Sequence, residues 1–109
     1  MKLIKSIVRP NKVDDVRDAL GKLGIAGITV TEVRGHGKQK GHTAVYRGKE
    51  YNVNLLPKME LEVVVEDNVA EDVIKAVIQA ARTGEIGDGR VFVIPVEQSY
   101  RIRTGELAV

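Results

Sequence analysis

A chain of 109 residues suits one compact domain, and an apolar content of 43% is enough for a single core. Only 4% of the residues are aromatic, so that core must consist of Val, Ile, Leu and Ala. The absence of cysteine excludes disulfides and thiolate metal sites and is typical of a reducing compartment. No apolar run approaches the roughly 20 residues that span a bilayer, and the N-terminal run is too brief for a signal peptide. We therefore expect a soluble cytoplasmic protein.

The net charge of +2 is unevenly distributed along the chain. The segment from Gly35 to Val53 carries four basic side chains and one acidic side chain, whereas the remainder is nearly neutral. A basic segment suits phosphates, an acidic partner or a membrane-proximal surface. A solvated loop whose charge serves solubility explains the same composition, so charge alone leaves both interpretations open.

The N-terminal third predicts a strand followed by a helix. Residues 2–8 are rich in Leu and Ile and form the strand, Pro10 ends it, and Asn11 is suited to cap the helix. From Lys12 onward, apolar positions recur at helical spacing, at Val13, Val16, Leu20 and Leu23. Gly24 is placed to end this helix.

A second strand and a long connection follow. Gly27 to Arg34 carries Ile, Thr and Val and predicts a strand. Gly35 to Val53 has neither a helical period nor strict alternation, and a structureless loop of this length in a small domain tends to be functional. We predict that residues 36–55 form a protruding effector loop, which Pro57 closes.

The C-terminal half repeats the strand–helix–strand pattern. Strict alternation predicts a strand with one buried face, formed by Met59, Leu61, Val63 and Val65. Asp67 or Asn68 can cap the next helix, whose inward stripe is expected at Val69, Val73, Ala76, Val77 and Ala80. Residues 82–90 predict a Gly-rich turn, and residues 91–96 a fully apolar strand whose Pro95 indicates an edge or a terminus. Residues 97–109 form a polar C-terminal segment.

The predicted order is β-α-β-loop-β-α-β within a single domain, residues 1–109. Right-handed crossovers then give an α+β, ferredoxin-like sandwich, in which two helices cover one face of a four-stranded antiparallel sheet and the long loop joins strands 2 and 3. Residues 91–96 are apolar on both faces of their strand, and Val64 is apolar on the otherwise polar face of its strand. The face that the helices do not cover therefore has apolar surface. We expect this face to be buried against other subunits.

Two groups of residues are suited to phosphates. In residues 83–90, glycines allow backbone N–H groups to turn toward an anion, and Arg90 adds a charge-assisted donor. The segment lacks the P-loop pattern, and a tight turn without a ligand explains it as well. Arg101 and Arg103 would share a face of an extended chain, although two solvated arginines are equally consistent. The loop histidines, His36 and His42, have no paired ligand spacing and are expected to be exposed.

Four sequence elements occur together in one order. GHGKQKGHT and YRGKEY lie in the long loop, TGEIGDGRVFV spans the second turn, and RIRTGE lies near the C-terminus, with TVTEV ahead of the first. Together they resemble the PII signal-transduction family over nearly all of the chain. The resemblance implies a homotrimeric sensor of adenylate energy and 2-oxoglutarate in nitrogen control, with nucleotide sites in the clefts between subunits. Asn54 slightly favours the channel-associated paralogue.

The same resemblance assigns the site residues. The phosphates would lie on the turn at Gly87, Asp88, Gly89 and Arg90, and Arg101 and Arg103 would reach them from the C-terminal segment. The remaining pocket would be lined by Ile7, Thr29, Gly35, Gly37, Lys38, Gln39, Glu62 and Val64. The carboxamide oxygen of Gln39 would ligate Mg²⁺ held by the ATP phosphates, and 2-oxoglutarate would chelate the same ion. Lys58 would pair with a carboxylate of 2-oxoglutarate, in a site completed by Gln39, Lys40, Gly41 and Gly87.

The resemblance makes the long loop the part that partners recognise. Arg47 at its tip would enter a pore or an acidic pocket, and partners would be an ammonium channel, nitrogen-metabolism enzymes or regulators. Tyr51 matches a tyrosine that is uridylylated in some members, whereas Lys49 departs from the family pattern and places an added charge two residues away. No nucleic acid is expected as a partner. Contact with the inner membrane would occur only through a channel.

The predicted function is therefore regulatory, not enzymatic, with slow ATP hydrolysis conceivable as a side activity. The alternative is a small nucleotide-hydrolysing or phosphoryl-transfer enzyme on the same scaffold, but no nucleophile is placed beside a base. A third reading, an RNA-binding sheet, is weak because such sheets stack bases on aromatic side chains and this chain has one Phe.

Overall fold

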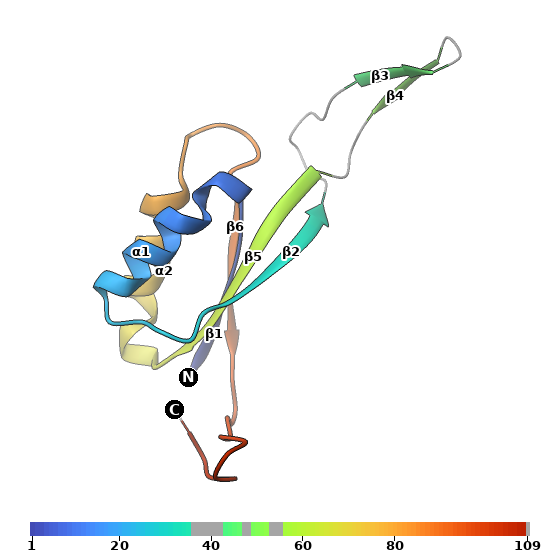
Figure 1. The fold of residues 1–109 in the computed structure, drawn as a ribbon. Coiled ribbons are helices and arrows are strands. Elements are labelled where there is room, and N and C mark those ends of the chain that lie inside the picture. Colours follow the sequence, from blue (N-terminus) through green and yellow to red (C-terminus); the bar gives the residue numbers. More distant parts are fainter. Residues whose placement is uncertain (36–42, 47–48, 53–55, 109) are drawn as a thin grey trace.

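The computed structural model describes residues 1–35, 43–46, 49–52 and 56–108 (Figure 1). Four strands form one antiparallel sheet in the order β2-β5-β1-β6, and α1 and α2 both lie on one face of it (Figure 1). The elements of this layer pair are β1 (Lys2–Val8), α1 (Val13–Lys22), β2 (Thr29–Gly35), β5 (Leu56–Val65), α2 (Asp67–Ala81) and β6 (Gly89–Pro95). The ferredoxin-like prediction is confirmed, and β6 is an edge strand, as Pro95 indicated. None of the helices in these ranges combines the length and apolar character that a membrane span requires.

The first helix confirms its predicted face but not its predicted cap. Pro10 starts a short 3-10 helix, η1 (Pro10–Lys12), and so Asn11 lies inside a helical turn instead of capping one. Val16 and Leu20 are fully buried, whereas Leu23 lies just past the last turn and is 45% exposed. Gly24 follows with a φ of 77°, the left-handed conformation that commonly ends a helix.

The second helix also begins without a side-chain cap. Glu66 occupies the N-cap position and makes no capping hydrogen bond, and Asp67 and Asn68 already lie within the helix. The predicted caps are therefore wrong by one and two residues. Asp67 instead pairs with the N-terminal amino group at 3.0 Å. The buried stripe is Ala70, Val73, Val77 and Ala81, while the predicted Val69, Ala76 and Ala80 pack only at its margin.

The core lies between the helices and the sheet face toward them. β1 contributes Ile4 and Val8, and β5 contributes Leu61, Val63 and Val65, all at most 7% exposed. Met59 packs at the margin of this cluster. The predicted alternation of β5 is thus confirmed, because the side chains of one set all point into the core.

Pro57 lies within β5 instead of closing the loop before it. It pairs with Arg34 of β2, and the ladder between β5 and β1 begins only two residues later, at Met59. β5 therefore has one neighbour at this point. A residue without a backbone N–H is tolerated there, because only one side of the strand needs a donor.

The open face of the sheet is apolar at one end and charged in the middle. The register places Ile94, Leu3 and Val64 in one row across β6, β1 and β5. Phe92 lies in the next row, and Ile94, Val64 and Phe92 are each about two-fifths exposed. In the charged part, the Lys5 Nζ lies 3.1 Å from the Glu60 Oε1. An uncovered face with these side chains agrees with the expectation of an oligomer, which itself stays a prediction.

The long connection contains regular structure that the sequence did not indicate. β3 (Thr43–Tyr46) and β4 (Lys49–Asn52) pair in an antiparallel hairpin, and Figure 1 shows both well away from the main sheet, beyond the end where β2 stops and β5 begins. The expectation of a structureless loop is therefore wrong for these residues. Each strand has only four residues, too few for a period to be recognised, although Thr, Val and Tyr favour strands.

Candidate functional site

The connection from α2 to β6, residues 82–88, forms a turn at one end of the sheet. Three glycines in and beside it have positive φ: Gly84 (90°), Gly87 (100°) and Gly89 (109°). A Cβ at position 89 would lie 1.7 Å from the carbonyl oxygen of Ile7, so only glycine fits there. This close approach fixes the end of the turn against β1.

The carboxylate of Asp88 lies at the centre of the turn. Its Oδ2 accepts hydrogen bonds from the backbone N–H groups of Thr83 (2.9 Å) and Gly84 (2.8 Å). Its Oδ1 accepts from the Thr83 hydroxyl and from the Arg9 Nε at 3.1 Å. These bonds, foremost those from Thr83, hold the pKa of Asp88 well below its usual range, and so the group is a carboxylate at neutral pH.

Two cationic side chains, from β5 and from the residue after β1, also reach the turn. The Arg9 Nη2 donates to the carbonyl oxygen of Ile86 at 3.0 Å, and the Lys58 Nζ donates to the carbonyl oxygen of Gly87 at 2.7 Å. Burial and the charge of Arg9 lower the pKa of Lys58, while Asp88 opposes this shift. Positive charge from β5 and from the residue after β1 is therefore concentrated behind the turn.

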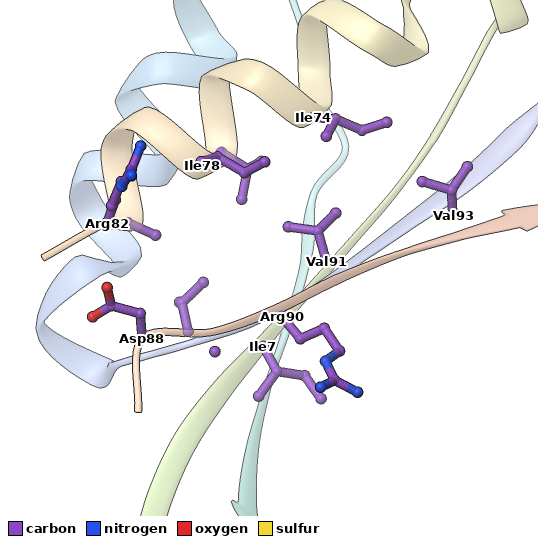
Figure 2. A pocket seen from close by; sticks show the side chains of 12 residues that line it. Ile7, Ile74, Ile78, Arg82, Asp88, Arg90, Val91 and Val93 are labelled. Carbon is purple, nitrogen blue, oxygen red and sulfur yellow. The ribbon is translucent and has the colours of Figure 1, made fainter. Parts of the chain in front are cut away.

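A cavity of about 350 Å³ lies on the helix side of β6 (Figure 2). Its walls include Ile74 and Ile78 of α2 and Val91 and Val93 of β6. Figure 2 shows that the side chains of Ile7 and Arg90, which also border it, point to the opposite side of β6. The cavity therefore lies on the helix side of β6, although Asp88 and Gly89 of the predicted phosphate-binding turn also line it.

The predicted pocket residues from the sheet all lie on the open face, but they are spread over several rows of it. Arg90 pairs with Ile7, next to the turn, whereas Thr29 pairs with Glu62 one row further along the sheet. Val64 pairs with Leu3 in the row beyond. Successive rows are two residues apart, or roughly 7 Å along a strand. Gly35 ends β2 at the same end of the sheet as the turn, opposite Leu56.

The C-terminal arginines lie far from the turn within one chain. Figure 1 shows residues 97–108 at the opposite end of β6 from residues 82–88. The seven residues of β6 separate the two ends by roughly 20 Å, at 3.3 Å per residue. One copy of the chain therefore does not bring Arg101 and Arg103 to Gly87–Arg90.

These arginines also do not lie on an extended chain. Tyr100 bridges to Leu107, the Arg101 N–H donates to Glu106 at 2.9 Å, and residues 102–104 form the turn between them. The expectation that Arg101 and Arg103 share a face of an extended strand is wrong, because this short hairpin bends the chain at their position. Both side chains are exposed.

Several predicted residues lie outside the described ranges: Gly37, Lys38, Gln39, Lys40, Gly41, Arg47, His36, His42 and Asn54. Tyr51 belongs to β4, where its backbone is opposite Ala44. Within the described ranges, no three His, Asp or Glu side chains gather in a way that could hold a metal ion.

Two functional candidates at the turn, Arg9 and Thr83, were not found from the sequence. Arg9 contacts Asp88 across 79 positions of sequence, and no motif connects them. Thr83 was recognised only as part of a Gly-rich segment, yet its hydroxyl and N–H both bind Asp88. The available signal was the pairing of a Thr and an Asp around two glycines, which is typical of a side-chain-stabilised turn.

Comparison with known proteins gives a consistent result over almost the whole chain. Residues 1–106 match the family model described as nitrogen regulatory protein P-II. A protein of that name from Azospirillum brasilense is 58% identical over 106 residues, which make up 97% of this chain and 95% of that protein. With the same coverage, the nitrogen regulatory protein P-II of Haemophilus influenzae is 57% identical to this chain. The nitrogen regulatory protein P-II 1 of Escherichia coli (strain K12) is 54% identical, again with the same coverage.

Proposed function

The chain belongs to the nitrogen regulatory protein P-II family, and from this premise we propose that it senses nucleotides and 2-oxoglutarate. It binds ATP or ADP, and 2-oxoglutarate together with Mg-ATP, in the clefts between the subunits of a homotrimer. The bound ligands set the conformation of the long loop, because ligands that bind its conformers unequally shift their populations. Partners in ammonium transport or nitrogen assimilation then recognise the loop.

The arrangement of the turn at residues 82–88 is the observation that carries this proposal. Arg9 and Lys58 donate hydrogen bonds to its carbonyl groups, and Arg9 also pairs with the Asp88 carboxylate. Two cations beside one carboxylate leave a net positive charge that suits an anion. Polyphosphates are well matched to such a glycine-rich turn with cationic side chains nearby. Arg90 adds a further cation on the open face, two residues beyond the turn.

The placement of the other predicted residues supports a site made by two subunits. Arg101 and Arg103 lie at the far end of β6 from the turn, so they reach phosphates bound there only from a neighbouring copy. The exposed apolar row of Ile94 and Val64 gives that copy a surface to bury.

Magnesium and 2-oxoglutarate join this site through two side chains. Mg²⁺ is a hard cation that takes phosphate oxygens and few protein oxygens, and the Gln39 amide adds a ligand without adding repulsion against the anions. When bound, Mg²⁺ neutralises phosphate charge and provides coordination sites for 2-oxoglutarate. Lys58 is a cation beside the turn, so its ammonium group is suited to a carboxylate of 2-oxoglutarate.

Calorimetric titration of 2-oxoglutarate at saturating Mg-ATP tests the metal assignment. We expect wild type to bind and Gln39→Ala to lose at least tenfold in affinity. Gln79→Ala, on the exposed surface of α2, is the matched control and should bind as wild type does. Unchanged binding by Gln39→Ala would contradict the role of Gln39, and absence of binding by wild type would contradict the proposal as a whole.

The long loop is the proposed partner-binding element in a cytoplasmic protein. Arg47 enters the partner. Asn54 slightly favours the channel-associated paralogue, and an ammonium channel would recruit the protein to the inner membrane. Co-purification with a detergent-solubilised ammonium channel, with and without Mg-ATP and 2-oxoglutarate, tests this. Ligand-dependent binding that Arg47→Ala abolishes supports the assignment, and binding insensitive to Arg47 contradicts it. Mass spectrometry of Tyr51 in nitrogen-limited cells would show whether it is uridylylated beside Lys49.

A further inference from the structure

We propose that Arg9 and Lys58 are positioning residues for the phosphate-binding turn: they hold two of its peptide planes so that the N–H groups of Gly87 and Asp88 face the nucleotide phosphates. The inference rests on the proposed function, because it assumes that this turn binds polyphosphate. Residues outside the turn would then explain how a flexible glycine-rich segment keeps its N–H donors directed at a ligand.

Arg9 and Lys58 fix the orientation of two peptide groups of the turn. Arg9 binds the carbonyl oxygen of Ile86 at 3.0 Å, and Lys58 binds the carbonyl oxygen of Gly87 at 2.7 Å. No peptide bond in the described residues is cis. In a trans peptide the C=O and the following N–H point in opposite directions. Two carbonyls held toward the cations therefore direct the N–H groups of Gly87 and Asp88 away from them.

Glycine at position 87 makes this outside support necessary. Its φ of 100° is readily reached, but glycine has many other conformations of similar energy. Without the two bonds, the peptide planes on either side of Gly87 could rotate and turn their N–H groups away from a ligand. A preorganised donor avoids that ordering cost at the moment of binding.

Asp88 is the anchor that keeps Arg9 in place. The Arg9 Nε binds the Asp88 carboxylate at 3.1 Å while the Nη2 binds Ile86, so one guanidinium joins two points of the turn. Both side chains are 23% exposed, which limits the competition from water. A carboxylate beside phosphates would repel them, but here it is bonded to Arg9 and to Thr83 and Gly84. Asp88 therefore contributes turn geometry and not a ligand contact from its side chain.

Charge and geometry make opposite predictions for one substitution. Asp88→Asn removes a negative charge near the phosphates, so an electrostatic role alone predicts tighter ATP binding. The positioning role predicts weaker binding, because the amide NH₂ cannot accept the bonds that the second carboxylate oxygen accepts. We expect the affinity for ATP to fall about tenfold, whereas the affinity for adenosine, which has no phosphate, should stay within twofold.

Arg9→Lys separates the same two roles at the other partner. Lysine keeps the charge, but a single ammonium group cannot replace a planar guanidinium that joins two acceptors. We expect Arg9→Lys and Arg9→Gln to lose ATP affinity to a similar extent, about tenfold. Lys58→Gln removes both the charge and the ammonium donor to the second carbonyl, so a loss of ATP affinity is expected from either role. Arg17→Gln, which removes an exposed arginine paired with Asp14 at 3.0 Å, is the control and should bind as wild type does.

Calorimetry with ATP and with adenosine, on all five variants and wild type, decides the inference. Thermal unfolding of each variant verifies that it is folded at the titration temperature, and either folded Arg9→Lys or folded Asp88→Asn is sufficient. Full ATP affinity in Arg9→Lys, or tighter binding in Asp88→Asn, would overturn the positioning role while the proposed function stands. Absence of ATP binding by wild type would instead overturn the proposed function, and this inference with it.

Discussion

Gly89 lies against the backbone of Ile7 at a separation that excludes any side chain: a Cβ on residue 89 would be 1.7 Å from the Ile7 carbonyl oxygen. The contact joins the first residue of β6 to β1 and sets where the turn at residues 82–88 ends. It also places Arg90, the next residue, beside Ile7 on the open face. The position of the candidate phosphate site thus depends on one glycine.

Gly89→Ala is expected to destabilise the protein by about 3 kcal/mol, because the added carbon meets backbone and the φ of 109° is strained for alanine. Urea unfolding measures the change. Gly21→Ala is the matched control, since nothing lies within 4 Å of its Cβ and it sits inside α1. That variant should gain roughly 0.5–1 kcal/mol. Equal effects at the two positions would contradict the account of the contact.

The core assignment of α1 is tested by two leucines of the same helix stripe. Leu20→Ala removes a side chain that is 1% exposed and should cost about 3 kcal/mol of unfolding free energy. Leu23→Ala truncates a side chain that lies past the helix end, and it should cost less than about 1 kcal/mol. Similar losses for both would show that Leu23 is part of the core after all.

The stability of the turn should respond to acid through Asp88. Because folding depresses its pKa, the carboxylate contributes stability above the pKa of the unfolded state, near 4, and loses it as the pH falls toward the folded-state pKa. Wild type should therefore lose more stability than Asp88→Asn between pH 4 and about pH 2. Chemical unfolding at several pH values measures this, with Asp72→Asn, an exposed carboxyl on α2, as the control. Parallel pH profiles for wild type and Asp88→Asn would contradict it.

The open face is expected to form the contact between subunits of the proposed homotrimer. Val64→Asp places a charge in the apolar row formed with Leu3 and Ile94, so it should convert trimers to monomers in light-scattering measurements. Leu23→Asp changes a side chain of similar exposure at the end of α1 and should leave the trimer intact. A trimer that survives Val64→Asp would place the interface elsewhere.

The fold could be predicted because two periods are strong in this sequence. The alternation from Met59 to Val65 and the spacing of Val16 and Leu20 each identified the buried face. Helix starts were missed because Pro10 initiates a 3-10 helix and Glu66, not Asp67, precedes α2. The hairpin of β3 and β4 was missed because four-residue strands show no clear period.

From the residues alone, the site could be predicted only in the parts that lie together in sequence. The family resemblance also grouped Lys58 with Gly87, and the structure places the Lys58 Nζ 2.7 Å from the Gly87 carbonyl oxygen. Glycines 84, 87 and 89 indicated a turn suited to anions, and the structure places them there with positive φ. Arg9 could not be found, because its partner Asp88 is 79 positions away and their contact follows from the pairing of β1 with β6. The conformation around Arg101 was also missed, since a bridge between Tyr100 and Leu107 leaves no periodic signal.

Nucleotide and 2-oxoglutarate are proposed to bind to one coupled site. Titration of wild-type protein with 2-oxoglutarate in the calorimeter, with Mg-ATP, with ATP and EDTA, and without nucleotide, tests it most directly. We expect appreciable binding only with Mg-ATP, because the metal held by the phosphates forms part of the 2-oxoglutarate site. Equal affinity in all three titrations would contradict it.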